Sequence, residues 1–173
     1  MLINANVGFR LYLMRQYDAA IEHWNKNLEM DPDFPLLHGY RGMAYVKKER
    51  YPEALAEFEK ARDTPGVIAC LGYVYGVAGR TREARKQLEA LRDLAKHKFV
   101  PAFYVALLYT GLGDKDQAFA WLDRAFEERS GYLTEIHVDP MFDPLRSDPR
   151  FEVLARRLGL EAAQPNPSPA FHP

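Results

Sequence analysis

Cysteine is almost absent from this chain of 173 residues. Cys70 is the single one, so no disulfide can form within the chain, and we expect a reducing, cytoplasmic environment. Neither sign of charge is in excess, since the formal net charge is −1, whereas binding to a phosphate backbone requires a basic surface. No apolar run is long enough to span a membrane, and the N-terminus lacks the residue order of a signal peptide. These absences argue against nucleic acid and membrane partners.

Motifs for catalysis and metal binding are missing as well. The histidines stand apart from one another in the sequence, with none at a metal-ligand spacing from the next. His137 and Asp139 are close together, but a polar connecting loop explains this pair better than a metal site does. Cys70 fits a small apolar position on a helix, and no serine lies in a G-x-S-x-G turn. With no grouped nucleophile, base and orienting residue, we expect no enzyme activity, no cofactor and no metal.

What the sequence does contain is an internal repeat. Five columns of residues recur with the same three spacings, 34, 30 and 34. The columns are small, small, aromatic or leucine, large and apolar, and mostly small. In that order they are Ala20, Ala54, Ala84 and Ala118; Gly8, Gly42, Gly72 and Ala106; Leu11, Tyr45, Tyr75 and Tyr109; Trp24, Phe58, Leu88 and Leu122; and Asn27, Ala61, Leu91 and Ala125.

Each repeat predicts two antiparallel helices joined by a short turn. We expect a small residue of the first helix to face a small residue of the second, with large residues packed beside that contact. A single hairpin cannot bury its apolar face, so neighbouring hairpins stack around one core. Gly79 and Gly113 mark helix ends, and Asp114 with Gln117 can cap the helix that follows. The expected helices lie near 2–14, 17–30, 35–48, 51–63, 67–78, 81–96, 100–112 and 115–129.

One repeat is shorter than the others. The spacing of 30 means that four residues are missing between Ala61 and Gly72. Four residues are close to one helical turn of about 3.6 residues, so the faces of the helices stay in phase. We expect a shortened helix or a tightened loop, with a local irregularity near Asp63–Gly66.

These residues resemble the tetratricopeptide repeat family, whose pattern extends over about 34 residues. The second unit carries the largest share of that pattern, namely Gly42, Tyr45, Tyr51, Ala54, Phe58 and Ala61. The resemblance covers residues 1 to about 130. It implies an all-α solenoid, a right-handed superhelix of four helix-turn-helix repeats at 1–34, 35–64, 65–98 and 99–130.

The repeat stops after residue 130, and we expect residues 131–160 to form a C-terminal cap. Asp148, followed by a proline, is typical of a helix start. Phe151, Leu154 and Leu158 recur at helical spacing and predict an amphipathic helix near 149–158. This helix would cover the exposed face of the last repeat.

The region around 138–160 also resembles the end of the C-terminal repeat arrays in a subset of bacterial signalling and regulatory proteins. Because Met1 coincides with the first position of the first repeat, we expect either an array detached from a longer protein or a short free-standing relative. Residues 161–173 are rich in proline and alanine and are expected to form a disordered tail.

The resemblance implies a concave surface lined by the first helix of each repeat. The residues that it places there form an aromatic groove with little charge: Asn6, Phe9, Tyr12, Tyr40, Met43, Lys47, Tyr73, Phe103, Tyr104 and Leu107. Asn6 alone matches the carboxylate clamp of some family members, so an acidic tail is not the expected ligand. Two interpretations stay open. The groove binds an apolar or extended peptide, with Lys47 at its rim and Phe171 as an internal placeholder, or its rings pack together as core.

The most direct functional expectation is a scaffold for protein–protein interaction that binds a protein or peptide. It could serve as the docking or sensor arm of a bacterial signalling or transcription-regulatory system. The alternatives are a self-associating assembly element, which acts through its first helix, and a non-catalytic part of an enzyme. A monomer and a weak homodimer are both compatible with the sequence.

Overall fold

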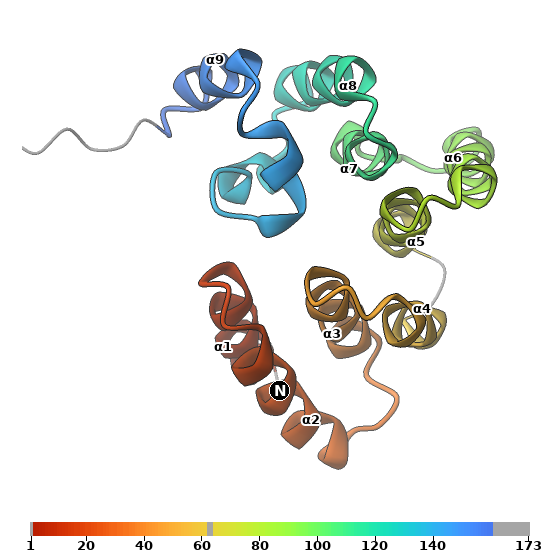
Figure 1. Cartoon of the computed structure of the whole chain (residues 1–173), viewed down its shortest axis with the longest axis vertical. Helices are drawn as coiled ribbons and strands as arrows, with labels where there is room; N and C mark the ends of the chain where they lie inside the picture. The colour runs from red at the N-terminus through yellow and green to blue at the C-terminus, as the bar shows by residue number, and fades with distance from the viewer. Residues whose placement is uncertain (1, 62–63, 161–173) are drawn as a thin grey trace, which may run out of the picture.

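The computed structural model describes residues 2–61 and 64–160, and all regular structure in these ranges is helical. The first eight helices form four hairpins, and each expected helix is confirmed to within three residues at either end. Figure 1 shows the first helix of each hairpin in an inner row and the second in an outer row. The helices are α1 (Leu2–Leu13), α2 (Tyr17–Met30), α3 (Pro35–Lys47), α4 (Tyr51–Lys60), α5 (Pro65–Val77), α6 (Thr81–Ala95), α7 (Ala102–Leu112) and α8 (Lys115–Glu127). The chain is therefore an α-helical solenoid.

The turn inside each hairpin has the same backbone geometry in all four repeats. Arg15, Glu49, Gly79 and Gly113 occupy one repeat position and have φ values of 62°, 58°, 74° and 74°. The amide after each of them donates to the carbonyl oxygen five positions earlier, at 2.7–3.1 Å. This arrangement satisfies the last carbonyls of a helix and requires a left-handed residue. Glycine adopts that conformation freely, whereas Arg15 and Glu49 adopt it at a cost.

The contact between the two helices of a hairpin differs from the expectation. A Cβ added at Gly8 would lie 2.2 Å from the Trp24 ring, and one at Gly42 would lie 2.6 Å from the Phe58 ring. In these two hairpins the glycine of the first helix therefore faces the large residue of the second helix, and not the small one. In the third hairpin a Cβ added at Gly72 would instead lie 2.4 Å from Leu108 of the next hairpin. A flat ring lying on a bare backbone fills this space without a gap in the first two hairpins.

The shortened repeat is explained by the length of α4. This helix has 10 residues, whereas α2 has 14 and α6 has 15. The four missing residues thus shorten a helix of the outer row. The helices of the inner row still stack on one another, as α3 and α5 do. Residue 63, at the start of the expected irregularity, lies outside the described residues.

The chain beyond α8 does not form a simple cap. It continues as two 3-10 helices, η1 (Gly131–Glu135) and η2 (Pro140–Leu145), and then as α9 (Pro149–Arg157). Helix α9 packs on α8 in the outer row, with an Arg150–Asp116 ion pair at 2.8 Å, as a cap would. By contrast, η1 and η2 lie on the inner side of the array (Figure 1). Prolines in η2 and the irregular spacing of its apolar residues prevent a single amphipathic helix here.

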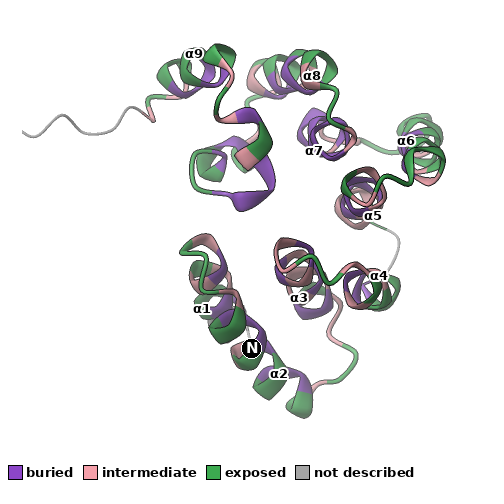
Figure 2. Ribbon diagram, viewed as in Figure 1, coloured by how far each residue is buried: buried purple, intermediate pink, exposed green. Residues whose placement is uncertain are grey.

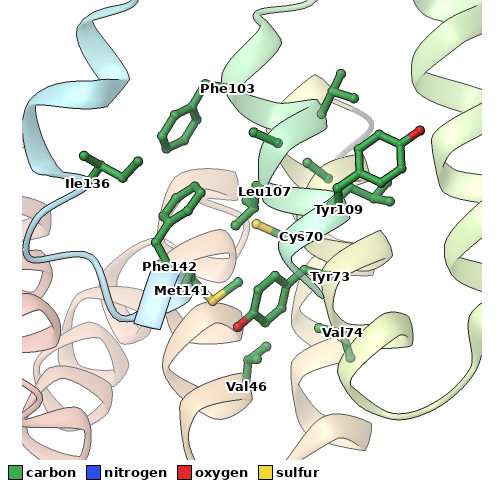
Figure 3. Close-up of a cluster of buried hydrophobic side chains, with 14 of the residues drawn as sticks. Val46, Cys70, Tyr73, Val74, Phe103, Leu107, Tyr109, Ile136, Met141 and Phe142 are labelled. Atoms are coloured by element: carbon green, nitrogen blue, oxygen red, sulfur yellow. The ribbon is translucent and has the colours of Figure 1, made fainter. Parts of the chain in front are cut away.

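The segment 131–145, which we call the inner segment, fills part of the concave face with apolar side chains. Figure 2 shows that much of its ribbon is buried. In Figure 3, Met141 and Phe142 point from it toward Tyr73, Cys70 and Leu107 on α5 and α7. Its buried side chains, each exposed by no more than 1%, are Leu133, Ile136, Met141, Phe142 and Leu145.

The inner segment also joins the end of the array to its beginning. The Arg15 guanidinium donates to both carboxylate oxygens of Asp143, at 2.7 and 2.9 Å. Arg146 donates to the same carboxylate at 2.7 Å. The first hairpin is thus held against a segment about 128 residues away in the sequence.

Candidate functional site

The concave face contains a cavity of about 770 Å³ between the inner helices and the inner segment. Helices α1, α3, α5 and α7 provide one part of its lining, and residues 131–139 provide the other. Apolar and aromatic side chains predominate. The lining residues are Phe9, Pro35, Leu36, Gly39, Tyr40, Met43, Phe58, Ala61, Thr64, Gly66, Val67, Cys70, Phe103, Tyr104, Leu107, Gly131, Tyr132, Thr134, Glu135 and Asp139.

Two groups of aromatic rings lie in this lining. Phe9 on α1 and Tyr40 on α3 are stacked, with their ring centroids 4.8 Å apart. Tyr132 on η1 lies 5.5 Å from Phe103 and 5.0 Å from Tyr104, both on α7. These rings hold one another in place before any ligand arrives. A preformed aromatic surface loses little conformational entropy on binding.

Six of the ten residues projected onto the groove line this cavity. They are Phe9, Tyr40, Met43, Phe103, Tyr104 and Leu107, from three of the four inner helices. Phe103 and Leu107 are largely buried, while Phe9, Tyr40, Met43 and Tyr104 are half-buried.

The other four projected residues lie elsewhere. Tyr12 and Tyr73 are buried, and the Tyr12 hydroxyl donates to Asp139 Oδ1 at 3.2 Å. The Lys47 ammonium donates to the Pro140 carbonyl at 2.9 Å, so it holds the inner segment. Asn6 is exposed and does not line the cavity. Phe171, considered as a placeholder, lies outside the described residues.

Sequence reasoning missed the contribution of the inner segment to the lining. Tyr132, Glu135 and Asp139 belong to a stretch that we expected to cover the last repeat. Their positions follow no repeat phase, so no column of the array could assign them. The available signal was Leu133 and Ile136 beside them, because a surface cap needs fewer apolar residues than this stretch contains.

Asp139 is an unusual group at the edge of the cavity. Burial raises its pKa to about 6, although hydrogen bonds from the Met141 amide and the Tyr12 hydroxyl act in the opposite direction. Burial also raises the pKa of the Cys70 thiol to about 12, which leaves it protonated and unreactive at neutral pH.

A second polar cluster is buried between α3 and α4 of the second hairpin. Glu57 Oε2 accepts from Arg41 Nε at 2.7 Å and lies 2.9 Å from His38 Nδ1. Burial raises the pKa of Glu57, but the hydrogen bonds from Arg41 and His38 more than offset this effect, and the pKa is below its usual value. Since every member has a partner, the cluster is accounted for by packing within this hairpin.

The described residues contain no group of three potential metal ligands among His, Cys, Asp and Glu. His137 and Asp139, the pair considered from the sequence, have other contacts. The His137 carbonyl accepts from Arg146, and its ring lies 6.5 Å from that of Phe151. Within the described ranges, no helix has the length and apolar character needed to cross a membrane.

Comparisons with known proteins agree with this architecture. A family model of the tetratricopeptide repeat matches residues 10–67. Residues 10–67 therefore match the tetratricopeptide repeat (TPR) family. A TPR repeat-containing protein of Borreliella burgdorferi is 27% identical over 141 residues. The match covers 72% of the chain described here and 61% of that relative's length. TPR repeats are generally non-enzymatic modules for protein–protein interaction.

Proposed function

We propose that this TPR chain is a docking protein that holds a peptide segment of a partner protein in its concave cavity. The observation that carries the proposal is the preformed aromatic lining of a cavity of about 770 Å³. A cavity of this size and apolar character suits several side chains of an extended peptide. The inner segment fills part of the concave face, and the cavity lies between it and the inner helices.

The docking role also suits a signalling context. The C-terminal region resembles the ends of repeat arrays in bacterial signalling and regulatory proteins, and the relative in Borreliella burgdorferi is longer than the matched region. We propose that the chain acts as a docking or sensor arm in such a cytoplasmic system.

The test uses a photoreactive amino acid placed in the cavity. Leu36 lines the cavity and is 39% exposed, whereas Val77 is 36% exposed and lies outside it. Crosslinking in the source cell from position 36, but not from position 77, identifies a partner of the cavity. The captured partner is then bound to purified Tyr40→Ala and Tyr45→Ala variants.

Tyr45 is a matched control, because it is a half-buried tyrosine on the same helix but outside the cavity. The proposal requires lost binding in Tyr40→Ala and retained binding in Tyr45→Ala, with both variants folded by circular dichroism. Equal binding by the two variants would contradict it.

A further inference from the structure

The cavity has acidic groups on one side only. Glu135 and Asp139 both line it, and the Asp139 amide donates to the Glu135 carbonyl at 2.8 Å, so the two residues follow each other on one turn. None of the lining residues is Lys, Arg or His. A carboxylate pair beside an apolar cavity attracts a positive group from a ligand.

The cations near this turn are engaged elsewhere. Arg15 and Arg146 both bind Asp143, and Arg146 also donates to the carbonyls of Ile136 and Asp139. Lys47 donates to the Pro140 carbonyl and lies 4.0 Å from Asp143. These basic side chains therefore bind Asp143 and backbone carbonyls and do not line the cavity. The charge of Lys47 also acts on Asp139 and lowers its pKa, but less than burial raises it.

One carboxylate oxygen of Asp139 is available to accept a hydrogen bond from a ligand. Its side chain is 9% exposed, and among the described residues both hydrogen bonds to it, from the Tyr12 hydroxyl and the Met141 amide, go to Oδ1. The position of the carboxylate is thus fixed by the protein. Oδ2 has no such partner within the described ranges and is left for a ligand donor.

Aromatic rings lie next to the acidic turn. Tyr132 is three residues before Glu135, and its ring stacks on Phe103. Tyr40 and Glu135 both line the cavity, and the negative charge of Glu135 adds to burial in raising the pKa of Tyr40. A cation that meets both a carboxylate and the face of a ring is held by two attractions that reinforce each other.

We infer that the cavity binds a peptide segment in which a Lys or Arg side chain stands between apolar side chains. The cation lies at Glu135 and Asp139 beside the rings, and the apolar neighbours contact Met43 and Leu107. This inference rests on the proposed docking function and adds the chemistry of the ligand. It also replaces the expectation, made from the sequence, of a nearly uncharged groove.

The experiment measures binding of labelled nine-residue peptide pools by fluorescence polarisation with the full chain. The pools carry Lys at the centre and a mixture of Leu, Ile, Val, Phe and Met at the two flanking positions. Matched pools replace the central Lys with Gln or Glu. We expect the Lys pool to bind about tenfold more tightly than the Gln pool, as a charge-assisted hydrogen bond suggests, and the Glu pool to bind most weakly.

The variants locate the cation. Glu135 is exposed, so Glu135→Gln should fold normally, and it is expected to remove the preference for Lys over Gln. Glu127→Gln is the matched control, because Glu127 is an exposed residue of α8 outside the cavity, and it should keep the preference. Glu135→Lys is expected to reverse the preference toward the Glu pool.

The outcomes separate the two proposals. Equal binding of the Lys and Gln pools, with binding lost in Tyr40→Ala, overturns the cation inference and leaves the docking function standing. Binding that survives Tyr40→Ala, or no binding of any pool, contradicts both. Full displacement of the Lys pool by spermidine at equal concentration would mean that the site takes a small polyamine, and this too overturns the inference.

Discussion

The helical array and the inner segment bury their apolar residues in different ways. In the array neighbouring hairpins repeat a contact, as Gly8 under Trp24 and Gly42 under Phe58 show. The inner segment has no repeat, and Phe142 and Met141 pack together against side chains of α5 and α7 (Figure 3). Contacts in the array are local, whereas those of the inner segment join distant parts of the chain. Local regularity therefore builds the solenoid, and a single irregular insertion shapes its concave face.

The largest effect is expected from Phe142→Ala. This ring is fully buried and lies 5.2 Å from the Phe103 ring, so its loss leaves a hole between the inner segment and α7. We expect the free energy of unfolding in urea to fall by about 3–5 kcal/mol. Phe99→Ala is the control, because Phe99 is 74% exposed, and it should change stability by no more than about 0.5 kcal/mol. Equal effects would mean that the inner segment is not part of the core.

A smaller effect is expected from the protonation of Asp139. Its folded pKa of about 6 is above the ordinary value of 3.8, so at pH 5 the folded chain holds a proton that the unfolded chain has released. The stabilisation is fully present below about pH 4 and is lost as the pH rises through about 6, a change of roughly 2–3 kcal/mol. Asp139→Asn should therefore gain stability relative to the unmodified chain between pH 4 and 7.5.

For Asp143→Asn, in the same segment, we expect the opposite dependence of stability on pH. Burial raises the pKa of Asp143, but hydrogen bonds from Arg15 and Arg146 more than offset it, so the folded pKa is lowered. Its contribution is present above the unfolded pKa and is lost as the pH falls. The Asn variant should therefore be relatively less stable at pH 7.5 than at low pH. Two variants with the same pH trend would rule out this assignment.

Within the array, Gly42→Ala tests the contact between a glycine and a ring. The added methyl group would lie 2.6 Å from the Phe58 ring, and overpacking of this kind costs about 1–3 kcal/mol. Gly131→Ala introduces the same methyl group where no atom lies within 4 Å, and thermal unfolding should show little change. Should Gly42→Ala melt like the unmodified chain, the glycine and the ring do not form the hairpin contact.

The smallest expected change in stability comes from replacing the left-handed residues Glu49 and Arg15, which occupy equivalent turns. Glu49→Gly relieves a left-handed residue and should stabilise the chain by up to about 1 kcal/mol. Arg15→Gly relieves the same strain but loses the ion pair with Asp143, whose partners are 47% and 33% exposed. It should therefore gain less, by an amount that disappears in about 1 M salt. A difference that persists in salt would show that Arg15 acts by packing and not by charge.

The sequence was sufficient for the features that repeat. It predicted the helix positions, the glycine turns at 79 and 113, and the cap of α8, where the Gln117 amide donates to Asp114 Oδ1 at 3.1 Å. These features depend on neighbours a few residues away, which a repeat displays several times. The expected contact between small residues was wrong, because column types do not show which column faces which.

The acidic side of the cavity could not be predicted in this way. Glu135 and Asp139 reach it because the chain turns inward after α8, and that turn depends on contacts with Tyr12 and Lys47 more than 90 residues earlier. Single occurrences with such long sequence separations have no pattern to reveal them. Their only trace was an excess of apolar residues in a stretch too irregular for a helix.

The Arg15–Asp143 contact has a consequence for how the protein folds during synthesis and how it unfolds. A linear array of hairpins can form in the order of synthesis, and its end units can fray one at a time. Here the first hairpin acquires its last partners only after Asp143 has left the ribosome. The same closure leaves neither end of the array as a free starting point for unfolding. Hydrogen exchange in the first and last hairpins should therefore be linked, so that protection is lost in both together.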